Sequence, residues 1–139
     1  MAIDFSTDHG QRVLQQLENE QVIWLTTVAR SGTPQPNPVW FQYVDGDIFI
    51  YTPADAKRLK NIVENNRVSL NFNTAPDGED VTVITGRIHW DDAFPKVIDN
   101  PAYLEKYAEG IKALGWSNEK MSADFPVVLR VHPENLRGW

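Results

Sequence analysis

The strict alternation of apolar and polar residues from Arg67 to Asn73 constrains the fold of this chain more than any other stretch. Val68, Leu70 and Phe72 fall at every second position, so their side chains lie on one face of a half-buried β-strand. A strand with one covered face needs neighbouring strands and a second layer of structure. We therefore expect an antiparallel sheet.

Other segments rich in β-branched and aromatic residues are separated by turn sequences. They are residues 21–30, 36–44, 47–51, 80–90 and 125–132. Asp45-Gly46-Asp47 is a tight hairpin signal. Pro36 and Pro38 cannot donate hydrogen bonds to a neighbouring strand, so this strand begins at a sheet edge or beside a ligand. Gly86 indicates a bulge or a close approach of another segment.

Three helices are predicted outside the strands and outside residues 47–63. Val13, Leu14 and Leu17 predict a packing helix after Ser6. A second helix follows Asn100-Pro101 and ends at Gly115, and a third is capped by Ser117. The whole pattern predicts a mainly β protein of five or six strands with short flanking helices, a small barrel or sandwich forming one domain over residues 1–139.

Residues 47–62 combine a strand with a basic helix. Thr52 is a suitable N-cap with Pro53 at the first helical position, so we expect the helix to begin there. Leu59, Ile62 and Val63 would form its apolar face. The other faces carry Lys57, Arg58, Lys60 and Asn61. This stretch predicts either a phosphate site, formed by the helix start and its cations, or an ordinary solvated helix surface.

Composition excludes several kinds of function. The net charge is −6 and the isoelectric point is about 4.9, which argues against general binding to nucleic acid. The chain has no cysteine, which rules out thiol nucleophiles and Cys-type metal sites. It has no basic leader and no apolar run near 18 residues, so we expect a cytoplasmic protein with no membrane partner.

Neither histidine metal sites nor acid–base pairs stand out. His9 has no second ligand at metal spacing beside it, so we expect a surface residue there. No neighbouring feature marks His89 or His132 as a ligand, so we expect structural roles for these two. Asp91-Asp92 is interpreted as a strand end. The catalytic residues are not predicted by any such motif.

The order of motifs resembles the pyridoxamine 5′-phosphate oxidase-like superfamily of flavin-binding split β-barrels, and within it the reductases that use the deazaflavin coenzyme F420. Four pieces of sequence carry the resemblance. They are Val22–Val28 followed by Gly32-Thr-Pro-Gln-Pro, Asn37-Pro-Val-Trp-Phe, the block from Tyr51-Thr-Pro to Asn66-Arg-Val-Ser-Leu, and Val83-Ile-Thr-Gly. Together they span residues 10–92.

The resemblance implies a cofactor site and a reaction. Such proteins bind the cofactor phosphate with the basic block, here Lys57, Arg58 and Lys60 with Asn61 beside them. The cofactor ring would lie along the second and third strands, near Pro38, Val39 and Trp40 and near Tyr51 and Thr52. The reduced cofactor would pass a hydride to an electron-poor double bond of a small organic substrate, with the product proton coming from water or Tyr51.

Several alternatives remain open at this stage. F420 is favoured over FMN because Arg30 and Arg67 could extend the positive charge toward its acidic tail, although Glu64 opposes this. The third possibility is a non-catalytic carrier of such a cofactor. The resemblance also implies a homodimer with cofactor sites at the subunit interface, to which residues 136–139 of the partner could contribute. The Arg-and-His motif of true pyridoxamine phosphate oxidases is not found near His132, which disfavours vitamin B6 oxidation. Haem-binding relatives need an axial iron ligand, and no neighbouring feature identifies His89 or His132 as one.

Overall fold

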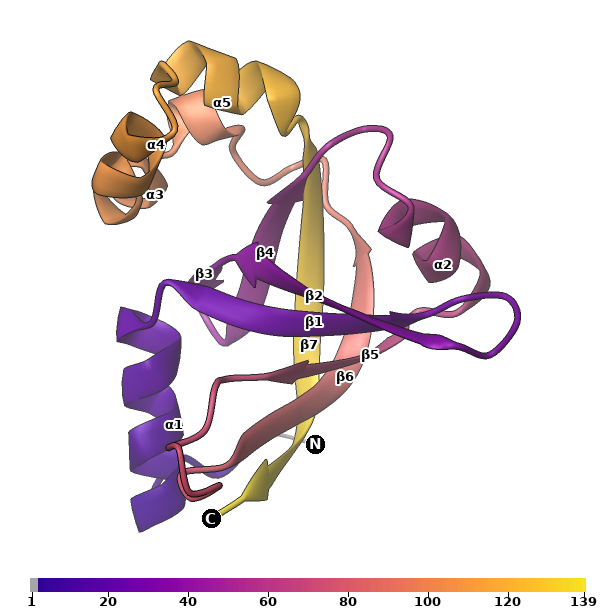
Figure 1. The fold of residues 1–139 in the computed structure, drawn as a ribbon, viewed down its shortest axis with the longest axis vertical. Helices are drawn as coiled ribbons and strands as arrows, with labels where there is room; N and C mark the ends of the chain where they lie inside the picture. Colours follow the sequence, from indigo (N-terminus) through magenta and orange to yellow (C-terminus); the bar gives the residue numbers. More distant parts are fainter. Residues whose placement is uncertain (1–2) are drawn as a thin grey trace.

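The computed structural model describes residues 3–139 and shows one curled antiparallel sheet with short helices around it (Figure 1). The sheet has seven strands in the order β2-β1-β5-β6-β7-β4-β3. The strands are β1 (Val22–Val28), β2 (Pro34–Trp40), β3 (Gln42–Val44), β4 (Asp47–Thr52), β5 (Arg67–Asn71), β6 (Thr82–Trp90) and β7 (Val127–Gly138). The sheet curls into a half-barrel, which confirms the predicted mainly β fold.

Short helices lie around the curled sheet. They are α1 (Asp8–Asn19), α2 (Arg58–Glu64), α3 (Pro101–Lys106), α4 (Ala108–Ala113) and α5 (Asn118–Asp124), with a 3₁₀ turn η1 at Val97–Asp99. In Figure 1, α3, α4 and α5 gather at one end of the sheet, while α2 stands apart beside the connection from β4. Among residues 3–139, no helix is both long and apolar enough to cross a membrane.

Strand β4 is buried along its whole length because both of its faces are covered. Ile48 and Ile50 point into the barrel, where they pack with Leu70, Ile84 and other residues of the main core. Phe49 and Tyr51 point outward, into a second core formed with the helices between β6 and β7. Burial on both faces explains why all six residues of β4 are buried.

Most of the predicted strands and turns are confirmed. Val44 pairs with Asp47 across a two-residue turn in which Asp45 and Gly46 have positive φ angles. The register of β6 and β7 shifts at Thr85/Gly86. A Cβ atom on Gly86 would collide with the main chain of His132, so the close approach predicted there is present.

The segment expected as one strand over residues 36–44 forms two strands. Strand β2 pairs with β1 and is one edge of the sheet, whereas β3 pairs with β4 at the other edge. The chain changes partner at Phe41, which is fully buried and whose N–H donates to the Tyr107 hydroxyl at 2.9 Å. The sheet therefore has seven strands instead of five or six.

Two helix predictions are corrected by the structure. Helix α2 begins at Arg58, not at Thr52 or Pro53, and Lys57 provides no side-chain cap. Thr52 is the last residue of β4 and pairs with Val127 of β7, so strand pairing overrides its local preference for a helix N-cap. Val63 is 74% exposed and does not join the apolar face of this helix.

The helix expected after Asn100-Pro101 is broken at Tyr107 into α3 and α4. Asn100 caps α3 by accepting a hydrogen bond from the N–H of Tyr103 at 3.2 Å. Gly115, with a φ of 73°, ends this helical region as predicted. Ser117 caps α5, also as predicted.

Candidate functional site

A groove follows the free edge of β2. It consists of two adjoining hollows of about 550 Å³ and about 320 Å³. Residues 34–37 of β2 line the first, residues 38–40 line the second, and Arg58 lines both. Successive residues of a strand point to opposite faces, so a groove lined by every residue of β2 runs along the strand edge.

The larger hollow is the polar end of the groove. Its wall opposite β2 is the segment that enters α2, with Ala56, Lys57, Arg58 and Asn61. Lys57 and Lys60 are both exposed, but only Lys57 lines the hollow. The structure thus brings Lys57, Arg58 and Asn61 to the groove, and it leaves Lys60 outside.

Arg58 is the half-buried cation at the junction of the two hollows. One guanidinium N–H donates to the hydroxyl of Thr52, and no carboxylate of residues 3–139 lies within ion-pair distance of it. Burial lowers the pKa of Arg58 from its usual value. A half-buried guanidinium without a carboxylate partner is suited to bind an anion.

Asn61 has a positioning role in the structure. Its side-chain amide nitrogen donates to the hydroxyl of Thr27 at 3.0 Å and to the side-chain oxygen of Gln35 at 2.9 Å. Thr27 belongs to β1 and Gln35 to β2, so Asn61 ties helix α2 to both strands. This fixes the distance between the basic segment and the edge of β2.

The smaller hollow is the apolar end of the groove. Pro38, Val39, Trp40 and Tyr51 line it. These are the residues for which contact with the cofactor ring is predicted. Thr52 is fully buried and does not line either hollow. Its contribution to the groove is the hydroxyl that accepts the hydrogen bond from Arg58.

The remaining wall of the apolar hollow comes from the helices between β6 and β7, which the sequence did not assign to the site. The residues are Tyr103, Leu114, Trp116, Met121 and Phe125. The aromatic residues among them were the only sign in the sequence that this region could belong to the site. Only the fold shows that they meet β2 and β4, because they lie far from both strands in the sequence.

Trp40 is held in place by the same helices. Its indole stacks on the Tyr107 ring with centroids 4.4 Å apart and planes 7° from parallel. The Tyr107 hydroxyl donates to the carbonyl of Gln21 at 2.7 Å and accepts from Phe41 N–H. A Cβ atom on Gly110 would lie 2.9 Å from the indole, so the small residue at that position gives Trp40 its room.

Tyr51 contributes its ring and main chain to the groove rather than a reactive hydroxyl. The hydroxyl donates to the Pro95 carbonyl at 2.6 Å and accepts from the Asn100 amide at 3.0 Å. Burial raises the pKa of Tyr51. A hydroxyl already committed in this way is a poor proton donor, so the structure disfavours Tyr51 as the source of a product proton.

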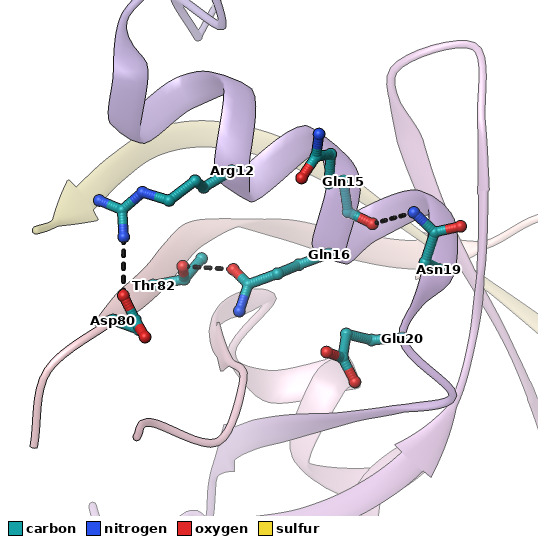
Figure 2. A pocket seen from close by; sticks show the side chains of 7 residues that line it. All are labelled: Arg12, Gln15, Gln16, Asn19, Glu20, Asp80 and Thr82. Carbon is teal, nitrogen blue, oxygen red and sulfur yellow. Dashed lines mark hydrogen bonds and ion pairs between the residues drawn. The ribbon is translucent and has the colours of Figure 1, made fainter. Parts of the chain in front are cut away.

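A further hollow of the protein is lined by polar side chains. Figure 2 shows a hollow between α1 and the start of β6, where Arg12 bonds Asp80 at 2.9 Å and Gln16 accepts from Thr82 at 2.6 Å. These side chains satisfy one another, and the hollow lacks an apolar wall for a ring. It is therefore a weaker candidate than the groove along β2.

The histidines and paired aspartates lie away from the groove. His132 contacts the Asp47 carboxylate at 2.9 Å and its ring stacks on His89 with centroids 4.8 Å apart. Asp91 accepts two main-chain N–H bonds and an Arg130 guanidinium bond just after β6, as expected of a strand end. Within residues 3–139, no three acidic or histidine side chains form a group that could hold a metal.

Comparison with known proteins agrees with this fold. An F420 reductase has a TM-score of 0.62 at 21% identity and covers 88% of this chain and 94% of its own. An FAD-binding protein of Mesorhizobium loti has a TM-score of 0.61 at 17% identity, covering 91% and 90%. HutZ, the haem storage protein of Vibrio cholerae, has a TM-score of 0.63 at 16% identity, covering 92% of each chain.

No curated protein sequence matches the chain. The family model described as pyridoxamine 5′-phosphate oxidase matches it over residues 10–139, a range that includes every strand and the whole groove. Since this match extends over nearly the entire chain, the protein belongs to the pyridoxamine 5′-phosphate oxidase family of split β-barrels.

Proposed function

We propose that the groove along β2 binds a phosphorylated flavin-type cofactor and that the protein is an oxidoreductase, with coenzyme F420 favoured. The observation that carries the proposal is the position of Arg58, a half-buried cation where a polar hollow meets an apolar one. A molecule with an anionic group at one end and a flat ring at the other matches this pairing of hollows.

The residues of the groove fit this group by their chemistry. Arg58 and Lys57 would hold the phosphate, with Thr52 orienting the guanidinium and Asn61 fixing the helix that carries it. Trp40, Trp116 and Phe125 would flank the ring and exclude water from one side. The bound cofactor supplies hydride transfer, and the chain supplies binding and orientation.

The preference for F420 over FMN rests on charge beyond the phosphate. F420 continues past its phosphate into an acidic tail. Two exposed cations, Lys60 and Arg67, follow Arg58 closely in the sequence and would attract this tail. Arg30 contributes less than its charge suggests, because it approaches Glu64 at 4.0 Å. The similarity to an F420 reductase supports this choice, and FMN is the alternative.

A non-catalytic carrier is the second candidate, and the similarity to a haem storage protein supports it. Haem would need an axial ligand. Of the residues that line the two hollows, none is a histidine. This observation favours a flavin-type ligand over haem in the groove.

Titration of the purified protein with F420, FMN and haem would test the proposal, followed by a reductase assay with the cofactor that binds. We expect F420 to bind most tightly and its reduced form to be oxidised by an activated alkene. Binding without turnover over a broad substrate panel would support the carrier. Failure of both F420 and FMN to bind would overturn the proposal.

We further propose that the protein is a homodimer. The support is the family membership together with exposed aromatic side chains, of which Trp90 is 37% and Trp139 59% exposed. The main chain of residues 136–138 pairs with β6 of the same chain, and that of Trp139 pairs with Val81, so the exposed Trp139 side chain is the part of this terminus that would contact a partner.

A further inference from the structure

The sheet side of the polar hollow carries a cross-strand pair, Thr27 of β1 and Gln35 of β2. The two residues are directly opposite one another in the register of these strands, so their side chains project from the same face of the sheet. Both line the polar hollow together with Arg58. Thr27 is only 1% exposed, so its hydroxyl lies at the closed end of the hollow.

Asn61 determines which polar groups of this pair are already used. Its side-chain amide nitrogen carries two hydrogens, and it donates to the Thr27 hydroxyl at 3.0 Å and to the Gln35 side-chain oxygen at 2.9 Å. Two acceptors occupy both hydrogens. Thr27 and Gln35 therefore act as acceptors toward Asn61, and their own hydrogens point elsewhere.

The hydrogens of Thr27 and Gln35 have no acceptor in the protein. A threonine hydroxyl that accepts one hydrogen bond still carries its O–H, and a glutamine that accepts through its oxygen still carries two N–H groups. Within residues 3–139, the two side chains make no hydrogen bonds other than those from Asn61. A buried donor without an acceptor costs free energy, so an acceptor that enters the hollow would stabilise the Thr27 hydroxyl.

We infer that Thr27 and Gln35 are the uncharged donors of the phosphate site, and that Asn61 sets the direction of their hydrogens. This inference rests on the proposed function. Phosphate oxygens accept several hydrogen bonds, and those from the sheet side would complement the ones from Lys57 and Arg58 on the opposite wall. A donor that bonds an ionised oxygen forms a stronger hydrogen bond than one that bonds a neutral acceptor.

The test is the affinity of the full chain for FMN and F420, measured by calorimetry. Thr27→Val removes the hydroxyl and nearly preserves the side-chain shape, and Gln35→Met removes the amide. We expect both variants to bind both cofactors more weakly, by about tenfold for the buried hydroxyl and about threefold for the exposed amide. Thr27→Ser keeps the hydroxyl and should bind with nearly the wild-type affinity.

Riboflavin is the matched ligand, because it is FMN without the phosphate. Its affinity should be the same in the wild-type protein, Thr27→Val and Gln35→Met. An equal loss of riboflavin and FMN affinity would place the effect of these residues on the ring and contradict their role at the phosphate.

The salt dependence of FMN binding separates these donors from residues that only position α2. Thr27 and Gln35 are uncharged, so their variants should lower the affinity while keeping the wild-type slope of affinity against salt concentration. Variants that instead displaced Lys57 and Arg58 would weaken a screened attraction and reduce this slope. Arg58→Ala is the reference, since it removes a charge and should reduce the slope.

The possible failures are distinguishable. Unchanged cofactor affinity in either Thr27→Val or Gln35→Met, or a reduced salt slope in both, would overturn the inference and leave the proposed cofactor site intact. Should thermal unfolding show that Thr27→Val is not folded, Gln35→Met decides, because Gln35 is exposed. Failure of both FMN and F420 to bind the wild-type protein would overturn the inference and the proposed function together.

Discussion

The Arg58 guanidinium donates a hydrogen bond to the hydroxyl of Thr52, six residues earlier in the chain. Thr52 ends a buried strand, and Arg58 begins the helix beside the groove. This bond fixes a half-buried cation relative to the sheet, at the boundary between the polar and apolar hollows. The position of an anion in the groove therefore depends on β4 as well as on the helix.

Arg58→Ala should weaken the binding of a phosphorylated cofactor by about 1.5–3 kcal/mol, the usual value of a hydrogen bond to a charged group. With FMN, which has no acidic tail beyond its phosphate, Lys60→Ala is the matched control, since Lys60 is an exposed cation of the same helix that does not line the groove. Calorimetric titration would measure both affinities. Equal losses in the two variants would contradict the assignment of the anion site to the groove.

Gly110→Ala should disturb the apolar end of the groove without touching the cations. The added methyl group would lie 2.9 Å from the Trp40 indole, so the indole must move from its stack on Tyr107. Alanine is otherwise favoured over glycine in a helix by about 1 kcal/mol. We expect a changed tryptophan fluorescence spectrum and weaker binding of the cofactor, while inorganic phosphate binds as before. An unchanged spectrum with normal cofactor affinity would show that Trp40 does not depend on this contact.

Lys106 should make the stability of the protein depend on pH. Its ammonium donates to the Phe41 carbonyl at 2.9 Å and lies over the Phe41 ring, yet burial lowers the pKa of Lys106 from 10.5 to about 8. Between these values the unfolded chain holds a proton that the folded chain has lost, so the contribution of Lys106 to the free energy of unfolding rises with pH.

Lys106→Met is the comparison for this effect, because buried tyrosines with raised pKa values titrate in both proteins. The difference in unfolding free energy between wild type and variant should shift in favour of the wild type from pH 8 to pH 10, as measured by urea denaturation. Parallel pH dependences of the two proteins would refute the lowered pKa.

F420 should bind more tightly than FMN at low ionic strength, and the gap should narrow as salt is added. The extra attraction acts between the acidic tail and exposed cations, which salt screens within about 10 Å at 0.1 M. A form of F420 with a shortened tail should lose part of the advantage. Equal affinity for the full-length and tail-less forms would leave FMN as the better candidate.

Sedimentation in the presence of cofactor should give the mass of a dimer at micromolar concentration. Exposed Trp90 and Trp139 are the aromatic residues that an interface would cover. A monomer under these conditions would contradict the proposed assembly.

Local periodicity was sufficient for much of the fold. The alternation of Val68, Leu70 and Phe72 predicted β5, and all three side chains are buried. The Asp45-Gly46 hairpin and the caps at Ser117 and Gly115 were also predicted, because their geometry depends on neighbouring residues alone. The assignment of residues 1–139 to one domain stays a prediction, and residues 1 and 2 lie outside the described structure.

Along the candidate site, the residue types were evident from the sequence but their arrangement was not. The basic block and the stretch around Trp40 were both identified, and the structure places Lys57, Arg58 and Trp40 along one groove. Lys60 lies outside the groove, and Thr52 contributes only by accepting a hydrogen bond from Arg58. The directions of the Lys57, Arg58 and Lys60 side chains depend on where α2 begins. The helix begins only at Arg58 because Thr52 pairs with Val127 as the last residue of β4.

The sequence by itself determined the strands, the turns and the presence of a compact basic segment, since hydrophobic periodicity and turn chemistry act over a few residues. Only the tertiary structure decided that Trp116, Met121 and Phe125 close the apolar end of the groove, and that the prolines of β2 face it. The curl of the sheet and the change of strand partner at Phe41 bring these segments together. Such contacts join residues far apart in the chain, and no local pattern encodes them.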